Sequence, residues 1–338
     1  MYIPVPGQYQ VSTRSVSTFP ILARFNFPSS KCGQLLWQSK MPYAPQDDVE
    51  FRTLDGLTLR GWLYPASIPH GPAVIINCGF NMPKDVLAPQ IARYFQKKGV
   101  TALVYDNRSI GLSDGKPEND IDPQKQVSDC HDAVTFLSQH PLVNPAKITL
   151  WGLSLSGAVA LATAALDPRV AAVISLAPTA KLNIPPEKQA TILRRAIDDR
   201  VAQVTKNAPP VYIPMVSEED GSNLGGLPID PQAIRQLERL SPHFKNYFTI
   251  QTSYRLIYWS ILDLLPKIRC PVMVVAPERD AITQPEVQKA EVFDLIASEK
   301  RFEVIEGKGH WDWWEADGGL EGVLGVQLGW MGEKLVAS

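Results

Sequence analysis

From residue 48 onward, apolar runs of strand length alternate with segments of helical periodicity. Residues 49–64 read as two alternating strands around the turn Asp55-Gly56, a strong signal for a β-hairpin. Short continuous apolar runs, of the kind that form strands buried on both faces, follow at 73–78, 101–105, 148–151, 170–176, 271–276 and 302–305. Helices are predicted over about 84–99, 122–140, 157–167, 285–297 and from 319. This alternation predicts a mostly parallel sheet with helices on both faces.

Residues 180–262 interrupt the alternation. Helical patterns cover 186–206, 230–240 and 251–264, prolines and a glycine-rich loop separate them, and strand-like runs are nearly absent. We interpret this stretch as a helical lid inserted in a core made of residues 46–179 and 263–338. Residues 1–45 are rich in Pro, Ser and Gln with isolated aromatics. They predict an arm that packs on the body or on a second subunit, as in a homodimer.

The stretch 147–157 carries the clearest candidate for chemistry. Its apolar run is broken at Gly152, and a strong helix pattern begins at Gly157. A strand that turns into a helix within a few residues, with a serine at the turn, is a nucleophile elbow. The residues two before and two after the nucleophile must be small, and around Ser154 they are Gly152 and Ser156. Ser156 is a rival nucleophile, but only Ser154 has a glycine two residues before it.

A serine hydroxyl needs a base to become a nucleophile at neutral pH. Only His243 and His310 follow the elbow along the chain. His310 comes directly after the last predicted strand and has a glycine before it, whereas His243 falls inside the predicted lid, where a pocket-lining or exposed role is expected. We therefore predict His310 as the base.

The third member should be an acid on another loop at a strand end. Asp280 lies just beyond the strand predicted at 271–276. A buried carboxylate there would accept the Nδ1–H of His310, fix its tautomer and stabilise the imidazolium. Glu278 is the nearest competitor, and Asp263 and Asp312 fit the loop position less well.

Two backbone N–H groups are predicted to hold the oxyanion, those of Leu155 after the nucleophile and Phe80 after the strand at 73–78. The Asn81 side chain is an alternative group to orient a substrate carbonyl. Aromatic residues are predicted to wall an acyl pocket, namely Phe80, Tyr254, Tyr258, Trp259, Trp311, Trp313 and Trp314. For Trp313 and Trp314, a core cluster at the end of the sheet is an equal alternative.

Composition narrows the partners. Lys+Arg 33 against Asp+Glu 35 gives a formal charge of -2 without a basic stripe, which argues against nucleic acid. The four cysteines have no C-x-x-C spacing, so neither zinc nor a disulfide scaffold is indicated, and we expect no metal or cofactor. No apolar run reaches bilayer-spanning length, and residues 1–30 lack the pattern of a secretory signal. We therefore expect a cytoplasmic protein. Arg108 is expected to hold the loop 105–115 in place by salt bridges.

The segments Gly152–Gly157, Asp280 and Gly309-His310 are arranged as in the α/β-hydrolase superfamily, which the chain resembles. The hairpin 51–65 and the loop 105–115 resemble more narrowly the polyketide-transferase and hydrolase-like proteins of fungal secondary-metabolite clusters, over about residues 46–337. Departures are Ser156 where Gly is usual and Cys78 where His is usual. The resemblance implies an eight-stranded α/β-hydrolase fold with a lid, and acyl chemistry without a cofactor.

These observations predict a serine-dependent acyl hydrolase or acyltransferase. Its substrate would be an ester or thioester of a polyketide-like acyl chain, free or carrier-bound, that passes through an acyl-enzyme on Ser154. One alternative is a cyclase, lyase or C–C bond hydrolase that uses the same groups as base and oxyanion hole. The other is a binding protein without catalysis, because a fold alone does not prove a function.

Overall fold

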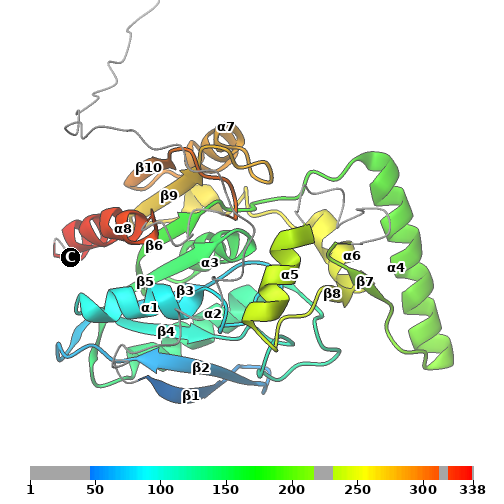
Figure 1. The fold of residues 1–338 in the computed structure, drawn as a ribbon, viewed down its shortest axis with the longest axis horizontal. Helices are drawn as coiled ribbons and strands as arrows, with labels where there is room; N and C mark the ends of the chain where they lie inside the picture. The colour runs from blue at the N-terminus through cyan, green and yellow to red at the C-terminus, as the bar shows by residue number, and fades with distance from the viewer. Residues whose placement is uncertain (1–45, 217–230, 312–318, 337–338) are drawn as a thin grey trace, which may run out of the picture. The chain divides into compact units, whose positions relative to one another are not determined.

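The structure, a computed structural model, describes residues 46–216, 231–311 and 319–336. Its centre is an eight-stranded sheet in the order β1-β2-β4-β3-β5-β6-β9-β10 (Figure 1). The strands are β1 (Asp47–Arg52), β2 (Thr58–Tyr64), β3 (Gly71–Asn77), β4 (Thr101–Tyr105), β5 (Val143–Leu153), β6 (Val170–Leu176), β9 (Val272–Pro277) and β10 (Lys300–Ile305). β2 runs antiparallel to β1 and β4, and every other neighbouring pair is parallel. The predicted mostly parallel eight-stranded sheet is confirmed.

Helices cover both faces of this sheet, as predicted. They are α1 (Ala88–Lys97), α2 (Pro123–Ser138), α3 (Leu155–Leu166), α7 (Pro285–Gln288), which continues as the π-helix η3 (Lys289–Phe293), and α8 (Gly319–Val336). α2 and α3 pack on each other and on β5, while α1 and α8 pack on each other and on β3, β4 and β6. The first ten residues of α3 are all buried, which fits a helix that is apolar on every side.

A buried polar pair fixes α8 on the sheet. Trp151, near the carboxyl end of β5, is among the largest fully buried side chains. Its Nε1–H donates to Oε1 of Gln327 on α8 at 2.8 Å. A buried indole N–H needs such an acceptor. The strand that leads to the elbow is thereby held from the α8 side.

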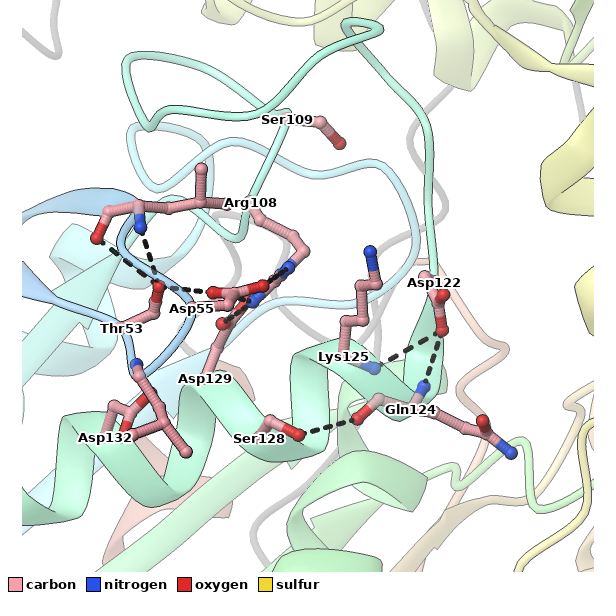
Figure 2. A network of polar contacts seen from close by, with 12 residues as sticks. Thr53, Asp55, Arg108, Ser109, Asp122, Gln124, Lys125, Ser128, Asp129 and Asp132 are labelled. Carbon is pink, nitrogen blue, oxygen red and sulfur yellow. Dashed lines mark hydrogen bonds and ion pairs between the residues drawn. The ribbon is translucent and has the colours of Figure 1, made fainter.

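Arg108 holds the loop after β4 in place, as the sequence predicts (Figure 2). Its Nε donates to Asp129 Oδ2 of α2 at 2.7 Å, and Nη1 donates to Asp55 Oδ2 of the β1–β2 turn at 2.8 Å. Burial disfavours the charged guanidinium, but the two carboxylates outweigh it and raise the pKa of Arg108. The hydrogen bond from Arg108 is the largest cause that lowers the pKa of Asp55, to about 2. Three segments distant in sequence are therefore joined by one side chain.

The chain between β6 and β9 forms α4 (Pro186–Lys206), β7 (Tyr212–Pro214), α5 (Pro231–Leu240), β8 (Tyr247–Thr249), α6 (Ile250–Tyr258) and the 3₁₀ turn η2 (Leu265–Lys267). The three predicted helices are present, although α6 ends at Tyr258 because Trp259 adopts extended angles. β7 and β8 pair antiparallel in a two-stranded sheet that was not predicted from the sequence. The arm, residues 1–45, and residues 217–230 lie outside the described residues.

Polar contacts join the segment between β6 and β9 to the loop that precedes α2. Arg255 of α6 donates from Nη1 to Asp120 Oδ1 at 2.8 Å. The backbone N–H of Ile121 donates to Thr252 Oγ1 at 2.8 Å. α6 is therefore anchored on the loop that precedes α2. Among the described residues, no helix has the length and apolar character required to cross a bilayer.

Candidate active site

Ser154 lies in the sharp turn between β5 and α3. Its backbone has φ +56° and ψ -123°, a conformation that non-glycine residues rarely adopt. Two hydrogen bonds hold it there, from the Ser154 N–H to Leu176 O at 2.8 Å and from the Thr179 N–H to Ser154 O at 3.2 Å. At Gly152 a Cβ would lie 2.2 Å from the carbonyl oxygen of Ser156, so only glycine fits. Strained backbone of this kind clusters at functional sites.

Asp280 and His310 meet at the carboxyl ends of two neighbouring parallel strands. Asp280 follows β9, His310 follows β10, and His310 Nδ1 lies 2.8 Å from Asp280 Oδ2. Both residues are buried, at 3% and 4% exposure. Thr283 Oγ1 also donates to Oδ2, and the N–H groups of Ile282 and Thr283 donate to Oδ1, each at 2.8 Å. These donors fix the direction of the carboxylate toward the imidazole.

The same donors decide the charge of Asp280. Burial raises the pKa of this carboxyl, but the hydrogen bond and charge of His310 and the hydrogen bonds of Thr283 together outweigh it and lower the pKa below the ordinary value. Asp280 is therefore a carboxylate at neutral pH. An ionised acid that accepts from Nδ1 leaves the Nε2 of His310 as the site for proton transfer.

The competing residues lie elsewhere. Glu278 accepts the N–H of Gly307 through Oε2 at 2.7 Å, and Asp263 is exposed. His243 lines a separate polar hollow beside Lys116 and Lys245. Asp312 is outside the described residues.

A single cavity brings Ser154 and His310 together. Its other described lining residues are Cys78, Gly79, Phe80, Met82, Leu153, Leu155, Thr179, Leu182, Met215, Leu256, Ile282 and Trp311. The walls are almost entirely apolar. Leu182, Met215 and Leu256 come from the segment between β6 and β9, which therefore forms one wall. The Ser154 hydroxyl contacts the Thr179 hydroxyl, with 3.2 Å between the oxygens.

The two backbone groups predicted to hold an oxyanion also border this cavity. Leu155 is the first residue of α3, so its N–H has no acceptor inside the helix. Phe80 stands between Gly79 at φ +91° and Asn81 at φ +56°. These left-handed residues turn the chain sharply on both sides of Phe80. The Gly79 N–H donates to Ser156 Oγ at 3.0 Å.

Ser156, the rival nucleophile, is thus used structurally. It is 3% exposed and is absent from the described lining of the cavity. Its hydroxyl joins α3 to the loop after β3. The serine that replaces the usual glycine holds the strand-end loop that carries Phe80.

Of the residues predicted to form the pocket, some line the cavity and others do not. Trp311 lines the cavity, and its ring meets the His310 ring edge-on with 5.1 Å between centroids. Asn81, predicted to orient a substrate carbonyl, is absent from the described lining, and its buried amide donates to Lys245 O at 2.8 Å and accepts from Asn119 Nδ2 at 2.7 Å. Trp313 and Trp314 lie outside the described residues.

The prediction for Tyr254 and Tyr258 is corrected in the same way. The two rings, one helical turn apart, contact each other with centroids 5.3 Å apart, and neither is part of the described lining. Leu256, between them in sequence, points to the opposite side of α6 and lines the cavity instead. Trp259 is buried in the hydrophobic core.

Thr179 and the aliphatic walls of the cavity were not predicted from the sequence. Thr179 follows β6, so the rule that active residues lie after strand ends could have found it. Within the described part of the chain, no group of three or more His, Cys, Asp or Glu side chains is placed to hold a metal ion. Burial raises the pKa of the Cys78 thiol, which keeps it neutral.

Comparison with known proteins identifies the family of this chain. A family model described as serine aminopeptidase, S33, matches residues 69–317. The polyketide transferase grgF of Penicillium sp is 45% identical over 285 residues, which cover 84% of this chain and 95% of the relative. A thiohydrolase of Eupenicillium brefeldianum is 41% identical over 278 residues, 80% of this chain and 88% of the relative.

Solved structures give the same result. The crystal structure of the alpha/beta hydrolase GrgF from Penicillium sp. sh18 has a TM-score of 0.80 at 44% identity and covers 86% of this chain and 99% of that chain. The structure of DcsB in complex with its substrate analogue has a TM-score of 0.79 at 34% identity and covers 86% of this chain and 100% of that chain. The chain therefore belongs to the α/β-hydrolases, in the same family as the fungal polyketide transferases.

Proposed function

We propose that this protein is a serine-dependent acyl hydrolase or acyltransferase for esters or thioesters of polyketide-like acyl chains. The observation that carries the proposal is the shared cavity of Ser154 and His310, with His310 Nδ1 hydrogen-bonded to the buried Asp280. The names of the relatives, polyketide transferase, thiohydrolase and acyltransferase, support the same reaction class.

In the first half-reaction, the Ser154 hydroxyl turns from Thr179 toward Nε2 of His310 and attacks the acyl carbonyl. His310 takes the proton, and the Asp280 carboxylate stabilises the resulting imidazolium. The N–H groups of Leu155 and Phe80 hold the oxyanion, and the helix N-terminus favours its charge. The leaving thiol or alcohol receives its proton from His310, which leaves the acyl group on Ser154 as an ester.

In the second half-reaction, His310 deprotonates water or another acceptor, and the acceptor attacks the ester. The bond from the acyl carbon to Ser154 Oγ breaks, and His310 gives the proton to Ser154 Oγ. The described walls contain no Asp, Glu, Lys or Arg, and burial keeps the Cys78 thiol neutral. An uncharged, apolar acyl chain fits such walls, because a buried charge without a partner is strongly unfavourable. The substrate is therefore an apolar acyl group whose polar part lies near Ser154.

A panel of acyl thioesters and esters with intact-mass readout tests the proposal. The wild-type protein should gain the mass of one acyl group and turn over the best substrate. Ser154→Ala should do neither while keeping its melting temperature. The matched control is Ser128→Ala, an exposed serine on α2, which should react like the wild type. Acylation of Ser154→Ala at the wild-type rate would reject Ser154 as the nucleophile.

A further inference from the structure

Thr179 is held rigidly against the nucleophile by the loop after β6. Its N–H donates to the Ser154 carbonyl oxygen at 3.2 Å, and its hydroxyl lies 3.2 Å from Ser154 Oγ. The loop is braced from the other side, because the Ala177 N–H donates to Val275 O at 2.8 Å and Thr283 Oγ1, which donates to Asp280 Oδ2, lies 3.3 Å from Ala177 O. The Thr179 hydroxyl thus has a fixed place beside the reacting atoms.

The chemistry of the surrounding walls makes this hydroxyl distinctive. Among the described lining residues, Ser154 and Thr179 carry the only side-chain hydroxyls. The remaining polar side chains are the His310 imidazole, the Cys78 thiol and the Trp311 indole. Thr179 itself is 7% exposed, so solvent offers it little compensation for a lost partner.

Acylation removes that partner. Once Ser154 Oγ is an ester oxygen, it has no hydrogen to donate and accepts only weakly. The Thr179 hydroxyl is then a buried polar group without a good partner, which is unfavourable. A molecule that brings an O–H group to this point, beside the ester and His310, restores the hydrogen bond.

We propose that Thr179 binds the acceptor in the second half-reaction and that the acceptor is an oxygen nucleophile, an alcohol or enol hydroxyl or water. Thr179 holds the acceptor oxygen while His310 Nε2 takes its proton. The oxygen forms the new bond to the acyl carbon, the bond from that carbon to Ser154 Oγ breaks, and the proton passes to Ser154. This inference rests on the proposed acyl-enzyme at Ser154.

The test separates the two half-reactions with Thr179→Val, which keeps the shape and removes the hydroxyl, and Thr179→Ser, which keeps the hydroxyl. Thiol release in the burst phase reports acylation. Deacylation is followed with water, a short alcohol and a simple thiol as acceptors. A thiol is the control acceptor because S–H is a weak hydrogen-bond partner.

For Thr179→Val we expect the burst rate to stay within about twofold and deacylation by water and by the alcohol to fall roughly three- to tenfold, the worth of one neutral hydrogen bond. Exchange with the thiol should not change. Thr179→Ser should deacylate like the wild type. A larger fall for the alcohol than for water identifies an organic hydroxyl as the preferred acceptor, and the reverse identifies water.

Several results would overturn the inference. One is wild-type deacylation in Thr179→Val, and another is an equal loss with all three acceptors. If Thr179→Val does not fold, Thr179→Ser still tests the inference. A tenfold lower rate of deacylation by alcohol and by water in folded Thr179→Ser would by itself reject the inference. A wild-type protein with no burst and no acyl mass on Ser154 would instead contradict the proposed function itself.

Discussion

Ser156→Ala probes how the loop of Phe80 is positioned. The substitution removes the Oγ that accepts the Gly79 N–H at 3.0 Å, in a place where Ser156 is 3% exposed. If the loop does not move, a buried N–H is left without an acceptor, which costs about 1–3 kcal/mol. If the loop moves to find one, the Phe80 N–H moves with it, because Phe80 directly follows Gly79.

The penalty bounds the catalytic effect. Loss of a whole oxyanion donor lowers kcat by about 10²–10³-fold in other serine hydrolases. The loop that carries Phe80 will not move if the movement costs more free energy than the lost hydrogen bond. The total penalty of about 1–3 kcal/mol is therefore divided between a lower free energy of unfolding and a higher activation free energy. We expect kcat to fall about tenfold, equal to about 1.4 kcal/mol. The remainder should appear as a free energy of unfolding lower by about 1 kcal/mol.

The assay compares kcat, KM and urea unfolding of Ser156→Ala with those of Ser175→Ala. Ser175 is a matched control, since it is a fully buried serine on β6 whose Oγ has no hydrogen-bond partner among the described residues. Ser175→Ala should keep its kcat and its stability, and Ser156→Ala should keep its KM within about twofold. A wild-type kcat in Ser156→Ala, with the whole penalty seen as lost stability, would refute the positioning role.

Three further predictions follow from the same contacts. Asp280→Asn should lower kcat by about 10³–10⁴-fold without loss of fold, since an amide cannot stabilise the imidazolium of His310; a kcat within tenfold of the wild type would exclude Asp280 as the acid. Leu256→Ala should lower kcat/KM for long acyl chains more than for acetyl, whereas Tyr258→Ala should change neither, as steady-state kinetics on a chain-length series will show; equal effects would place the acyl chain elsewhere. Asp55→Asn should lower the free energy of unfolding by a constant amount above about pH 4 and by less as the pH falls toward 2, because the folded pKa of Asp55, about 2, lies below the unfolded value of 3.8. Urea titrations of both proteins from pH 3 to 7 measure this difference. A difference in the free energy of unfolding that grows on acidification would contradict the prediction.

Local rules explain why the turn at Ser154 and the proximity of Asp280 to His310 could be predicted. The turn at Ser154 excludes any residue but glycine at position 152, and this glycine can be recognised in the amino-acid sequence. Asp280 and His310 each follow a strand of a parallel sheet, and the carboxyl ends of such strands lie at one edge. The sequence therefore predicts their proximity without any knowledge of side-chain contacts.

The pocket walls could not be predicted because distant contacts set them. The hydrogen bond from Arg255 to Asp120 anchors α6 on the loop before α2. In this orientation of the helix, Leu256 lines the cavity and Tyr254 and Tyr258 do not. The Asn81 amide is hydrogen-bonded to the carbonyl oxygen of Lys245, 164 residues away, and to the Asn119 side chain. Strands β7 and β8 have three residues each, too few for a periodic pattern.

The most direct test of the account is a crystal structure of the protein after reaction with an alkyl fluorophosphonate. We expect phosphorus bonded to Ser154 Oγ, its oxygen about 3 Å from the backbone nitrogens of Leu155 and Phe80, and Nε2 of His310 within hydrogen-bonding distance of the phosphonate. A phosphonate on another residue, or a Ser154 adduct with the His310 ring turned out of the cavity, would contradict the account.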